Sequence, residues 1–574
     1  MEDEVELVGL KAGAAYNGKK GQVQGVTVDA SGEVRYNILL GDSSGSKLIK
    51  AANLKVLSGE DRSSVQALLP ICASIVEECC NPDGSMKRGS SESERGQIKG
   101  WMETARRACA HAVALAPAVA QTHIFLGVIN DTLGDLDESL RVYDRALEAL
   151  PSDAAPEVLL FKAKVVSRRD GPAVGGEAFR KAAEAADAAG SSTAAEAWFD
   201  CGSTLQKAGD HAGAIECYRK YGSVRTAGND DDRWSKTRYN LAKALLEVRS
   251  SKAASSASSE EETEKEKREL GEEAIRLFAE IVADHPGCAK AFTDLANSCR
   301  DVRGDIEAEL RHLKAGAAAI PDAASVTQSP DAAADLSMLH GNLAICLGKH
   351  GATKEEVLAQ WTKAATVDPK NASAQRSLGH LKLEMISASP PPPHREVLKL
   401  RSHVEEHYGF AALAQPEHAV GQYMYGEAVR VNTHLADLTP TPSRPAQLER
   451  AAAAFRAALA HWRDGVDVVG GGRGREEVLC SLGLVLGELL GPANAEAMAC
   501  YEEAIKLDPD HYPPHQYLGN ELLEAGRDAE AAAPLRRCLA LLGAEPVAKE
   551  SRAHADARRQ VQAALIHTPP RLRS

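Results

Sequence analysis

Residues 120–151 read AQTHIFLGVINDTLGDLDESLRVYDRALEALP, and this stretch decides the fold. Apolar residues recur every three or four positions on both sides of Gly134, which predicts two amphipathic helices joined by a tight turn. The small residues Gly127 and Ala146 allow the helices to approach closely, and the Tyr143 ring is expected to fill the space above them. The final proline ends the second helix because it lacks a backbone N–H. The stretch therefore predicts a helical hairpin.

The spacing of these residues resembles the tetratricopeptide repeat, a unit of 34 residues with two helices, A and B. With Pro151 at position 32, Leu126, Gly127, Gly134, Tyr143 and Ala146 fall at positions 7, 8, 15, 24 and 27. Similar sets recur along the chain: Trp198, Gly202, Gly209, Ala214 and Tyr218; Phe292, Leu295, Ala296, Ala308 and Ala315; Leu343, Ala344, Gly351, Trp361, Ala364 and Pro369; Leu482, Gly483, Tyr501, Ala504 and Pro509; Leu518, Gly519, Gly526 and Ala531. The resemblance implies a mainly α protein, an α-solenoid of about ten helix pairs over residues 100–543.

Three segments interrupt the repeat pattern and are expected to be insertions, near residues 250–269, 388–394 and 436–447. The first is rich in Ser, Glu and Lys, a composition typical of a solvated loop or of a charged helical extension. Residues 547–566 predict a C-terminal helix that caps the last repeat with a polar face. Residues 58–99 are expected to form a connecting helix and a linker.

Residues 1–57 carry a different pattern, in which short β-type runs alternate with turn residues such as Asn17-Gly18. Five short runs in this segment predict a small SH3-like barrel. The run Tyr16-Asn-Gly-Lys-Lys-Gly-Gln-Val-Gln-Gly25 resembles the KOW-type turn and strand of such barrels. Seven basic and seven acidic residues balance in this segment, so a structural or protein-contact barrel is favoured over a nucleic-acid-binding one.

Composition excludes several classes of function. The chain has 574 residues, a formal net charge of −14 and 4% aromatic residues, and an acidic chain is poorly suited to non-specific binding of nucleic acid. Its twelve cysteines include no Cys-x-x-Cys pair, which favours buried free thiols in a reducing compartment. The acidic N-terminus resembles no leader peptide, and no run reaches about 18 apolar residues, so we expect no membrane partner and a cytoplasmic protein, with the nucleus as the alternative.

The motifs of catalysis are missing from the sequence. The glycine-rich run Gly470–Gly474 lacks the Lys-Ser/Thr of a phosphate-binding loop, and neither a Gly-x-Ser-x-Gly nor a His-Glu-x-x-His motif is present. His403 and His407 have metal-ligand spacing on a helix, but the sequence offers them no third ligand. We therefore expect no catalytic residue, no metal and no cofactor, and the chain is not expected to be an enzyme.

The partner-binding surface is expected on the A helices, because positions 2, 5, 9, 12 and 13 of tetratricopeptide repeats point into a concave groove. Those positions, together with position 6, give eight candidates: Lys236, Tyr239, Lys243, Lys290, Asn297, Arg300, Asn342 and Arg376. An acidic peptide or a C-terminal carboxylate would suit these cations through charge-assisted hydrogen bonds. The set resembles part of the carboxylate clamp that holds chaperone tails, but Thr293, Ser373 and Ser377 stand where a full clamp has basic residues.

The sequence therefore predicts a non-catalytic scaffold or adaptor that binds an extended or acidic peptide of another protein. Two alternatives stay open. The chain can be an RNA-binding adaptor that uses the barrel and the basic groove, although its acidic charge argues against nucleic acid, or it can be a non-catalytic subunit of an enzyme complex. The sequence specifies neither the partner, nor the pathway, nor the oligomeric state.

Overall fold

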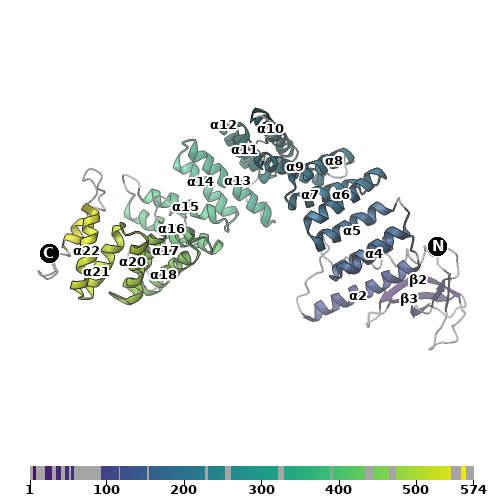
Figure 1. The fold of residues 1–574 in the computed structure, drawn as a ribbon, viewed down its shortest axis with the longest axis horizontal. Coiled ribbons are helices and arrows are strands. Elements are labelled where there is room, and N and C mark those ends of the chain that lie inside the picture. The colour runs from purple at the N-terminus through teal and green to yellow at the C-terminus, as the bar shows by residue number, and fades with distance from the viewer. Residues whose placement is uncertain are drawn as a thin grey trace. The chain divides into compact units, whose positions relative to one another are not determined.

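The computed structural model describes residues 4–7, 20–28, 34–40, 46–50, 54–56, 92–115, 117–151, 154–225, 231–251, 260–320, 329–387, 390, 392–433, 444–463, 474–543 and 557–563. The chain divides into two compact units, Met1–Ile281 and Val282–Ser574. Each unit is described by itself below. In Figure 1 the helices of each unit follow one another in chain order.

The first unit begins with an antiparallel sheet whose strand order is β4-β3-β2-β1-β5. Val5 pairs with Gly21 on one side and with Val56 on the other, and β2 is irregular between Val23 and Gly25. These pairings define a sheet, but they do not show the closed SH3-like barrel that the sequence predicts, so the barrel stays a prediction. The strands are β1 (Glu4–Leu7), β2 (Lys20–Val28), β3 (Val34–Leu40), β4 (Ser46–Lys50) and β5 (Leu54–Val56).

The rest of the described chain is helical. The first unit contains α2 (Glu92–Leu115), α3 (Ala120–Thr132), α4 (Leu136–Ala149), α5 (Ala155–Asp170), α6 (Pro172–Ala188), α7 (Ala194–Lys207), α8 (His211–Val224), α9 (Asp231–Ser251) and most of α10 (Glu260–Asp284). The second contains α11 (Ala289–Arg303), α12 (Ile306–Ala319), α13 (Pro330–Lys349), α14 (Lys354–Val367), α15 (Ala372–Ile386), α16 (His394–Ala414), α17 (Ala419–Thr433), α18 (Arg444–His461), α19 (Arg475–Leu490), α20 (Ala495–Leu507), α21 (Tyr512–Glu524) and α22 (Asp528–Gly543).

Within the described residues, α3 to α22 form ten successive helix pairs, from α3–α4 to α21–α22. Apart from α9–α10, the two helices of each pair make extensive contact, and within each unit neighbouring pairs also touch. In the α9–α10 pair, the Tyr239 ring packs edge-on against Phe278 at 5.6 Å between centroids. The predicted mainly helical solenoid is confirmed.

Local chemistry explains where the hairpins turn. Gly134 and Gly209 adopt φ angles of 87° and 85° between paired helices, a region that side chains other than glycine rarely occupy. The next helix then starts on a side-chain cap: Asp135 accepts a hydrogen bond from the Glu138 N–H, and Asp210 accepts one from the Gly213 N–H. A glycine followed by an aspartate therefore sets each turn.

The core repeats one contact between paired helices. A Cβ atom built on Gly202 would lie 2.6 Å from Cε1 of Tyr218, so helices α7 and α8 approach too closely for any side chain at that position. The Tyr218 ring is fully buried. The same glycine-to-aromatic contact recurs in the pairs Gly127–Tyr143, Gly379–Tyr408, Gly426–Phe455 and Gly483–Tyr501.

The structure also describes parts of the predicted insertions and cap. Helix α10 begins at Glu260, so the second half of segment 250–269 is a charged helical extension, whereas residues 252–259 lie outside the described residues. Residues 388–389, 391 and 434–443 lie outside them too. Of the predicted cap, residues 557–563 are helical, and Val561 is buried in the core that contains Leu535. Among the described helices, none is long and apolar enough to cross a membrane.

Candidate peptide-binding surface

All eight candidate residues lie on the first helix of a pair. Lys236, Tyr239 and Lys243 lie on α9 of the first unit. The second unit holds the other five, on α11 (Lys290, Asn297, Arg300), α13 (Asn342) and α15 (Arg376). These three A helices are neighbours, because α13 contacts both α11 and α15. The structure therefore brings five candidates onto one run of helices, and the three on α9 form a separate group.

The α9 group is only partly available to a ligand. Lys236 is exposed and Lys243 is half-buried. Tyr239 is half-buried because its ring contacts Phe278 of α10, so it helps to hold the pair together. The neighbouring Arg238 is buried and lies 3.6 Å from a carboxylate oxygen of Glu280. The sequence pattern did not single out Arg238, because its position faces the partner helix.

On α11 the predicted cations lie beside carboxylates of the chain itself. Arg300 Nη1 donates to Oε1 of Glu309 at 2.5 Å, and Arg300 Nε donates to Asp301 at 2.9 Å. Glu309 is 4% exposed, so this ion pair fastens α11 to α12. Burial raises the pKa of Asp335, and the nearby Lys290 ammonium opposes that rise. Arg300 and Lys290 therefore already interact with carboxylates of the protein itself, whether or not they also contact a ligand.

Arg376 differs from the α11 cations. Its guanidinium is half-buried, and Nη1 donates to the amide oxygen of Gln415 at 2.7 Å. Within the part of the chain that the structure describes, no carboxylate forms an ion pair with it. Burial lowers its pKa, since removing the cation from water is not offset by a nearby negative charge. Arg376 is therefore a half-buried cation that, among the described residues, is bonded to a neutral group and not to a counter-ion.

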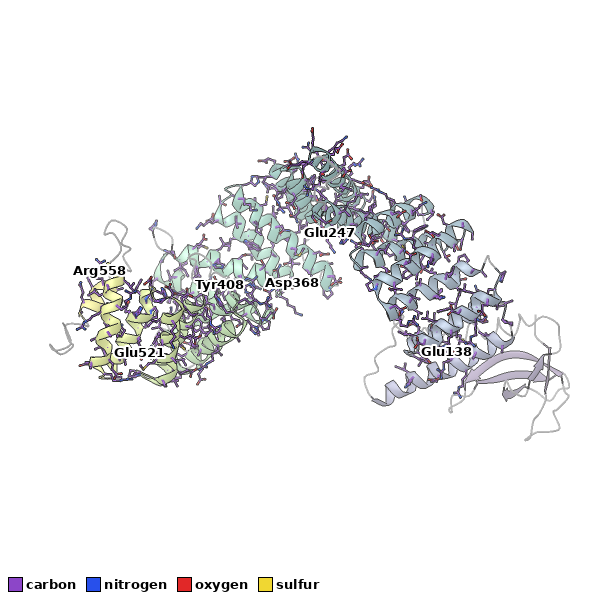
Figure 2. All side chains as sticks on the ribbon, viewed as in Figure 1. Glu138, Glu247, Asp368, Tyr408, Glu521 and Arg558 are labelled. Atoms are coloured by element: carbon purple, nitrogen blue, oxygen red, sulfur yellow. The ribbon has the colours of Figure 1, made fainter. Side chains whose placement is uncertain are left out.

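The helix beside α15 offers apolar contact area. Met338 and Ile345 on α13 are 49% and 46% exposed, although most large apolar side chains of the described residues are buried. They lie seven residues apart, and Asn342 lies between them, so the three share one face of the helix. His380 lies one turn after Arg376 on α15, and its ring packs edge-on against Tyr408 with 5.7 Å between the ring centroids. Burial lowers the pKa of His380. Tyr408 is labelled among the side chains in Figure 2. The surface thus combines one cation, one amide and two exposed apolar side chains.

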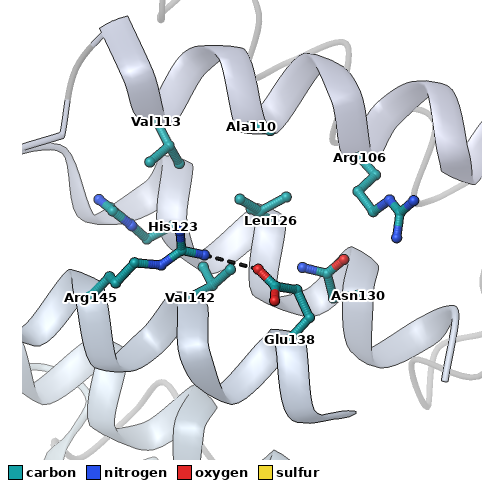
Figure 3. Close-up of a pocket in the computed structure, with 9 residues that line it drawn as sticks. All are labelled: Arg106, Ala110, Val113, His123, Leu126, Asn130, Glu138, Val142 and Arg145. Carbon is teal, nitrogen blue, oxygen red and sulfur yellow. Dashed lines mark hydrogen bonds and ion pairs between the residues drawn. The ribbon is translucent and has the colours of Figure 1, made fainter. Parts of the chain in front are cut away.

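A pocket of about 410 Å³, which the sequence analysis did not predict, lies among α2, α3 and α4 of the first unit. Figure 3 shows the ion pair between Arg145 and Glu138, which both line the pocket from α4, and their N–O distance is 2.9 Å. The Asn130 side chain lines the pocket, and its buried Oδ1 has no hydrogen-bond partner among the described residues. Helix α2 precedes the first full repeat, so no repeat position predicts this contact. Because Glu138 also binds Arg141, its charge is already neutralised within the chain.

Comparisons with known proteins agree with the repeat assignment. The family model described as "Tetratricopeptide repeat" matches residues 195–221, which cover α7 and most of α8, and residues 494–511, which include α20. The chain therefore carries tetratricopeptide repeats, as the sequence pattern predicts at Gly202 and at Tyr501. No curated protein shows significant sequence similarity to the chain.

Solved structures show a distant likeness. The C-terminal part of a TPR repeat-containing protein from Cytophaga hutchinsonii is 12% identical, covers 48% of this chain and 93% of its own, and has a TM-score of 0.36. Naa15/Naa10 bound to HypK-THB is 14% identical and covers 88% of this chain and 67% of its own, with a TM-score of 0.34. A human IFIT1 dimer with m7Gppp-AAAA is 14% identical and covers 74% and 91%, with a TM-score of 0.29. At these scores the likeness is too weak to bear on function.

Proposed function

We propose that this protein is a non-catalytic, cytoplasmic or nuclear scaffold that binds an acidic segment of another protein on the A helices of its second unit. The observation that carries the proposal is the half-buried Arg376 guanidinium, which donates to the neutral amide of Gln415 and has no counter-ion among the described residues. A carboxylate of a bound peptide would supply the missing counter-charge and form charge-assisted hydrogen bonds. Tetratricopeptide repeats offer such a surface because stacked hairpins present successive A helices side by side.

The neighbouring residues fit a peptide with mixed character. The exposed Met338 and Ile345 side chains supply apolar contact, and Asn342 can hydrogen-bond to a peptide backbone through its amide. An extended segment with an acidic residue next to an apolar one would satisfy both parts of the surface. The three α9 candidates, Lys236, Tyr239 and Lys243, form a second group of the same chemistry in the first unit, and we include them in the proposal as an additional contact.

We also propose that the five N-terminal strands belong to a small SH3-like barrel with a structural or protein-contact role. The strand order supports this assignment, because a meander of four strands with the fifth paired back to the first is the order of a small closed barrel. The irregularity between Val23 and Gly25 also supports it, since a bulge lets one long strand bend between two halves of a barrel.

Selection from a random peptide library tests the function. Peptides selected on the full-length protein are expected to be rich in Asp, Glu or C-terminal carboxylates. Arg376→Gln keeps a polar side chain with N–H donors but removes the charge, and is expected to weaken their binding by about tenfold or more. Arg311→Gln is the matched control, because Arg311 is exposed on the B helix α12 of the same unit.

Two results would contradict the proposal. One is that the folded wild-type protein selects no peptide. The other is that selected peptides bind wild type, Arg376→Gln and Arg311→Gln equally well. A single-stranded RNA of random sequence tests the RNA-binding alternative. If the protein binds this RNA in a salt-sensitive way, Arg376→Gln abolishes the binding and no peptide binds, the RNA-binding function replaces the scaffold function.

A further inference from the structure

Four basic side chains gather on one face of the α15–α16 pair, away from the A-helix positions of the candidate surface. Lys399, His403 and His407 are spaced four residues apart on α16, so they form a stripe along that helix. Lys382 of α15 lies beside the stripe, with its ammonium 2.8 Å from Nε2 of His407. Lys382, His403 and His407 are half-buried, and Lys399 is exposed. We call these four residues the basic cluster.

The hydrogen bonds of the cluster determine which atoms remain free. The Lys382 ammonium can only donate, so Nε2 of His407 must accept, and the proton of the neutral ring lies on Nδ1. That Nδ1–H donates to Oε1 of Gln375 at 2.7 Å, and the Gln375 amide nitrogen donates to the Pro369 carbonyl. This series of hydrogen bonds holds the Lys382 ammonium in place, and within the described part of the protein it uses one of the three N–H groups. Two donors on Lys382, together with Lys399 and His403, remain for a ligand.

The charges of the cluster are not neutralised by ion pairs. Among the described residues, no carboxylate forms a salt bridge with Lys382, Lys399 or His403. The nearest acidic influence is Glu406, which favours the charged forms of Lys382 and His403 but is outweighed by burial. Burial and the Lys382 charge lower the pKa of His407 to about 4. Each basic group therefore raises the energy of its neighbours' cationic forms, and a bound anion would relieve that repulsion.

We propose that the basic cluster binds the phosphate monoester of a phosphorylated side chain on a protein partner. Such a group carries nearly two negative charges and three acceptor oxygens, which match the two free Lys382 donors, the Lys399 ammonium and the His403 ring. The cluster is one hairpin wide, and the same two helices also carry the exposed Glu384, Glu396 and Glu406. Acidic neighbours admit a single dianionic group and repel a continuous polyanion such as RNA. The partner class rests on the proposed scaffold function.

A metal ion is a poorer occupant than an anion. Both ring nitrogens of His407 are already engaged, one as acceptor from Lys382 and one as donor to Gln375. In the part of the chain that the structure describes, no three His, Cys, Asp or Glu side chains lie close enough together to hold a metal. An ammonium within hydrogen-bond distance of a ligand nitrogen also opposes a bound cation. The arrangement of His403 and His407 therefore fits an anion-binding site better than a metal-binding site.

The test uses the full-length protein with 13C-labelled histidine, and follows the His403 and His407 ring signals by NMR, assigned with His403→Gln and His407→Gln. The probes are a short glycine- and alanine-based peptide with one phosphoserine, the same peptide without phosphate, and inorganic phosphate. The phosphopeptide is expected to shift both signals saturably and to raise the pKa of His403, because a nearby anion favours the protonated ring. The unphosphorylated peptide is expected to shift neither.

Lys382→Met keeps the length and apolar character of the side chain, and is expected to weaken phosphopeptide binding by about tenfold or more. Lys399→Met, at an exposed position that does not contribute to packing, is expected to weaken it to a smaller extent and covers the case in which Lys382→Met does not fold. Lys506→Met is the matched control, because Lys506 is exposed on α20 and distant in sequence from the cluster. It is expected to bind like wild type.

Several results would overturn the inference. They are equal binding of the two peptides, unchanged phosphopeptide binding in both folded lysine variants, inorganic phosphate binding as tightly as the phosphopeptide, or single-stranded RNA binding more tightly with the same lysine dependence. Arg376→Gln separates this inference from the scaffold proposal. Arg376→Gln is expected to leave phosphopeptide binding unchanged. Loss of acidic-peptide binding in Arg376→Gln and loss of phosphopeptide binding in the lysine variants of the basic cluster are therefore independent outcomes.

Discussion

Replacing Gly202 with alanine tests whether glycine is required where α7 and α8 meet. The new Cβ would lie 2.6 Å from Cε1 and 2.7 Å from Cδ1 of Tyr218, both well inside ordinary contact distance. The ring cannot turn away freely, because it is fully buried and its hydroxyl donates to Gln206 at 2.9 Å. Either the helices separate or the tyrosine moves and loses that bond, so Gly202→Ala is expected to destabilise the hairpin.

The magnitude follows from three opposing terms. Alanine gains about 1 kcal/mol over glycine inside a helix. Overpacking a filled core costs about 1–3 kcal/mol, and the strained hydroxyl bond adds about 1 kcal/mol. The net expectation is a loss of about 1–3 kcal/mol. Gly100→Ala is the control, since Gly100 is exposed on α2 and, apart from the adjacent backbone of its own helix, no described heavy atom lies within 4 Å of the Cβ position. It is expected to gain up to about 1 kcal/mol.

The sign of the Gly202→Ala effect is expected to change once the ring is removed. In a Tyr218→Leu background the contact no longer exists, so only the helix propensity of alanine remains and the substitution becomes neutral or stabilising. Native-state hydrogen exchange of the α7 and α8 amides is the suitable assay, because repeat arrays do not unfold as one cooperative unit. The reasoning is refuted if the α7 and α8 amides exchange as slowly in Gly202→Ala as in wild type. It is also refuted if Gly202→Ala has the same effect on exchange in the Tyr218→Leu background as in wild type.

Three further predictions concern charged groups. Arg300→Gln leaves the buried Glu309 carboxylate unpaired and is expected to cost about 2–3 kcal/mol in urea unfolding, whereas adding Glu309→Gln should recover most of that loss. Arg376→Leu removes an uncompensated cation and is expected to raise the midpoint of thermal unfolding, whereas Arg300→Leu is not. A lowered midpoint of the Arg376→Leu variant would contradict the account. The His407 pKa of about 4 lies below its usual 6.5, so the contribution of the neutral ring to stability is fully present above about pH 6.5 and is lost progressively as the pH falls from 6.5 to about 4, where the unfolded state binds the proton and the folded state does not. After allowance for solvent screening the contribution is about 1–2 kcal/mol, and thermal unfolding of His407→Gln between pH 7 and pH 4.5 should show a correspondingly weaker pH dependence.

The helical hairpins were predictable from the sequence because their determinants are local. Gly134 and Gly209 mark turns that need a positive φ, and an aspartate follows each of them to cap the next helix. The glycine at Gly202 and the aromatic at Tyr218 are sixteen residues apart, the separation that brings two antiparallel helices of this length into register. Each of these features depends on a short window of residues, so a repeated spacing suffices to predict them.

The electrostatics of the candidate surface were not predictable in the same way. A repeat position says which face of a helix a residue occupies, but it does not say which side chain on another helix lies within bonding distance. Arg300 and Arg376 both occupy groove positions, yet Glu309 of α12 neutralises the first, while the second donates to the neutral Gln415 and has no ion pair within the described residues. The basic cluster was missed for a related reason. Lys382 lies outside the groove positions, and its relation to His407 depends on how α15 and α16 pack.

The contrast between Arg300 and Arg376 gives a physical criterion for separating structural from ligand-binding charges in a helical array. A cation whose buried carboxylate partner lies in the same chain is required for folding, because losing it leaves an unpaired charge. A half-buried cation without a counter-ion costs stability in the free protein, and only a ligand can offset that cost. This criterion supports the proposals for Arg376 and Lys382 as ligand-binding charges in the second unit, whereas Arg300 has its counter-ion in Glu309. Arg376 and Lys382 lie six residues apart on α15, on different faces of one helix, so this single hairpin can bind a carboxylate and a phosphate of the same partner independently.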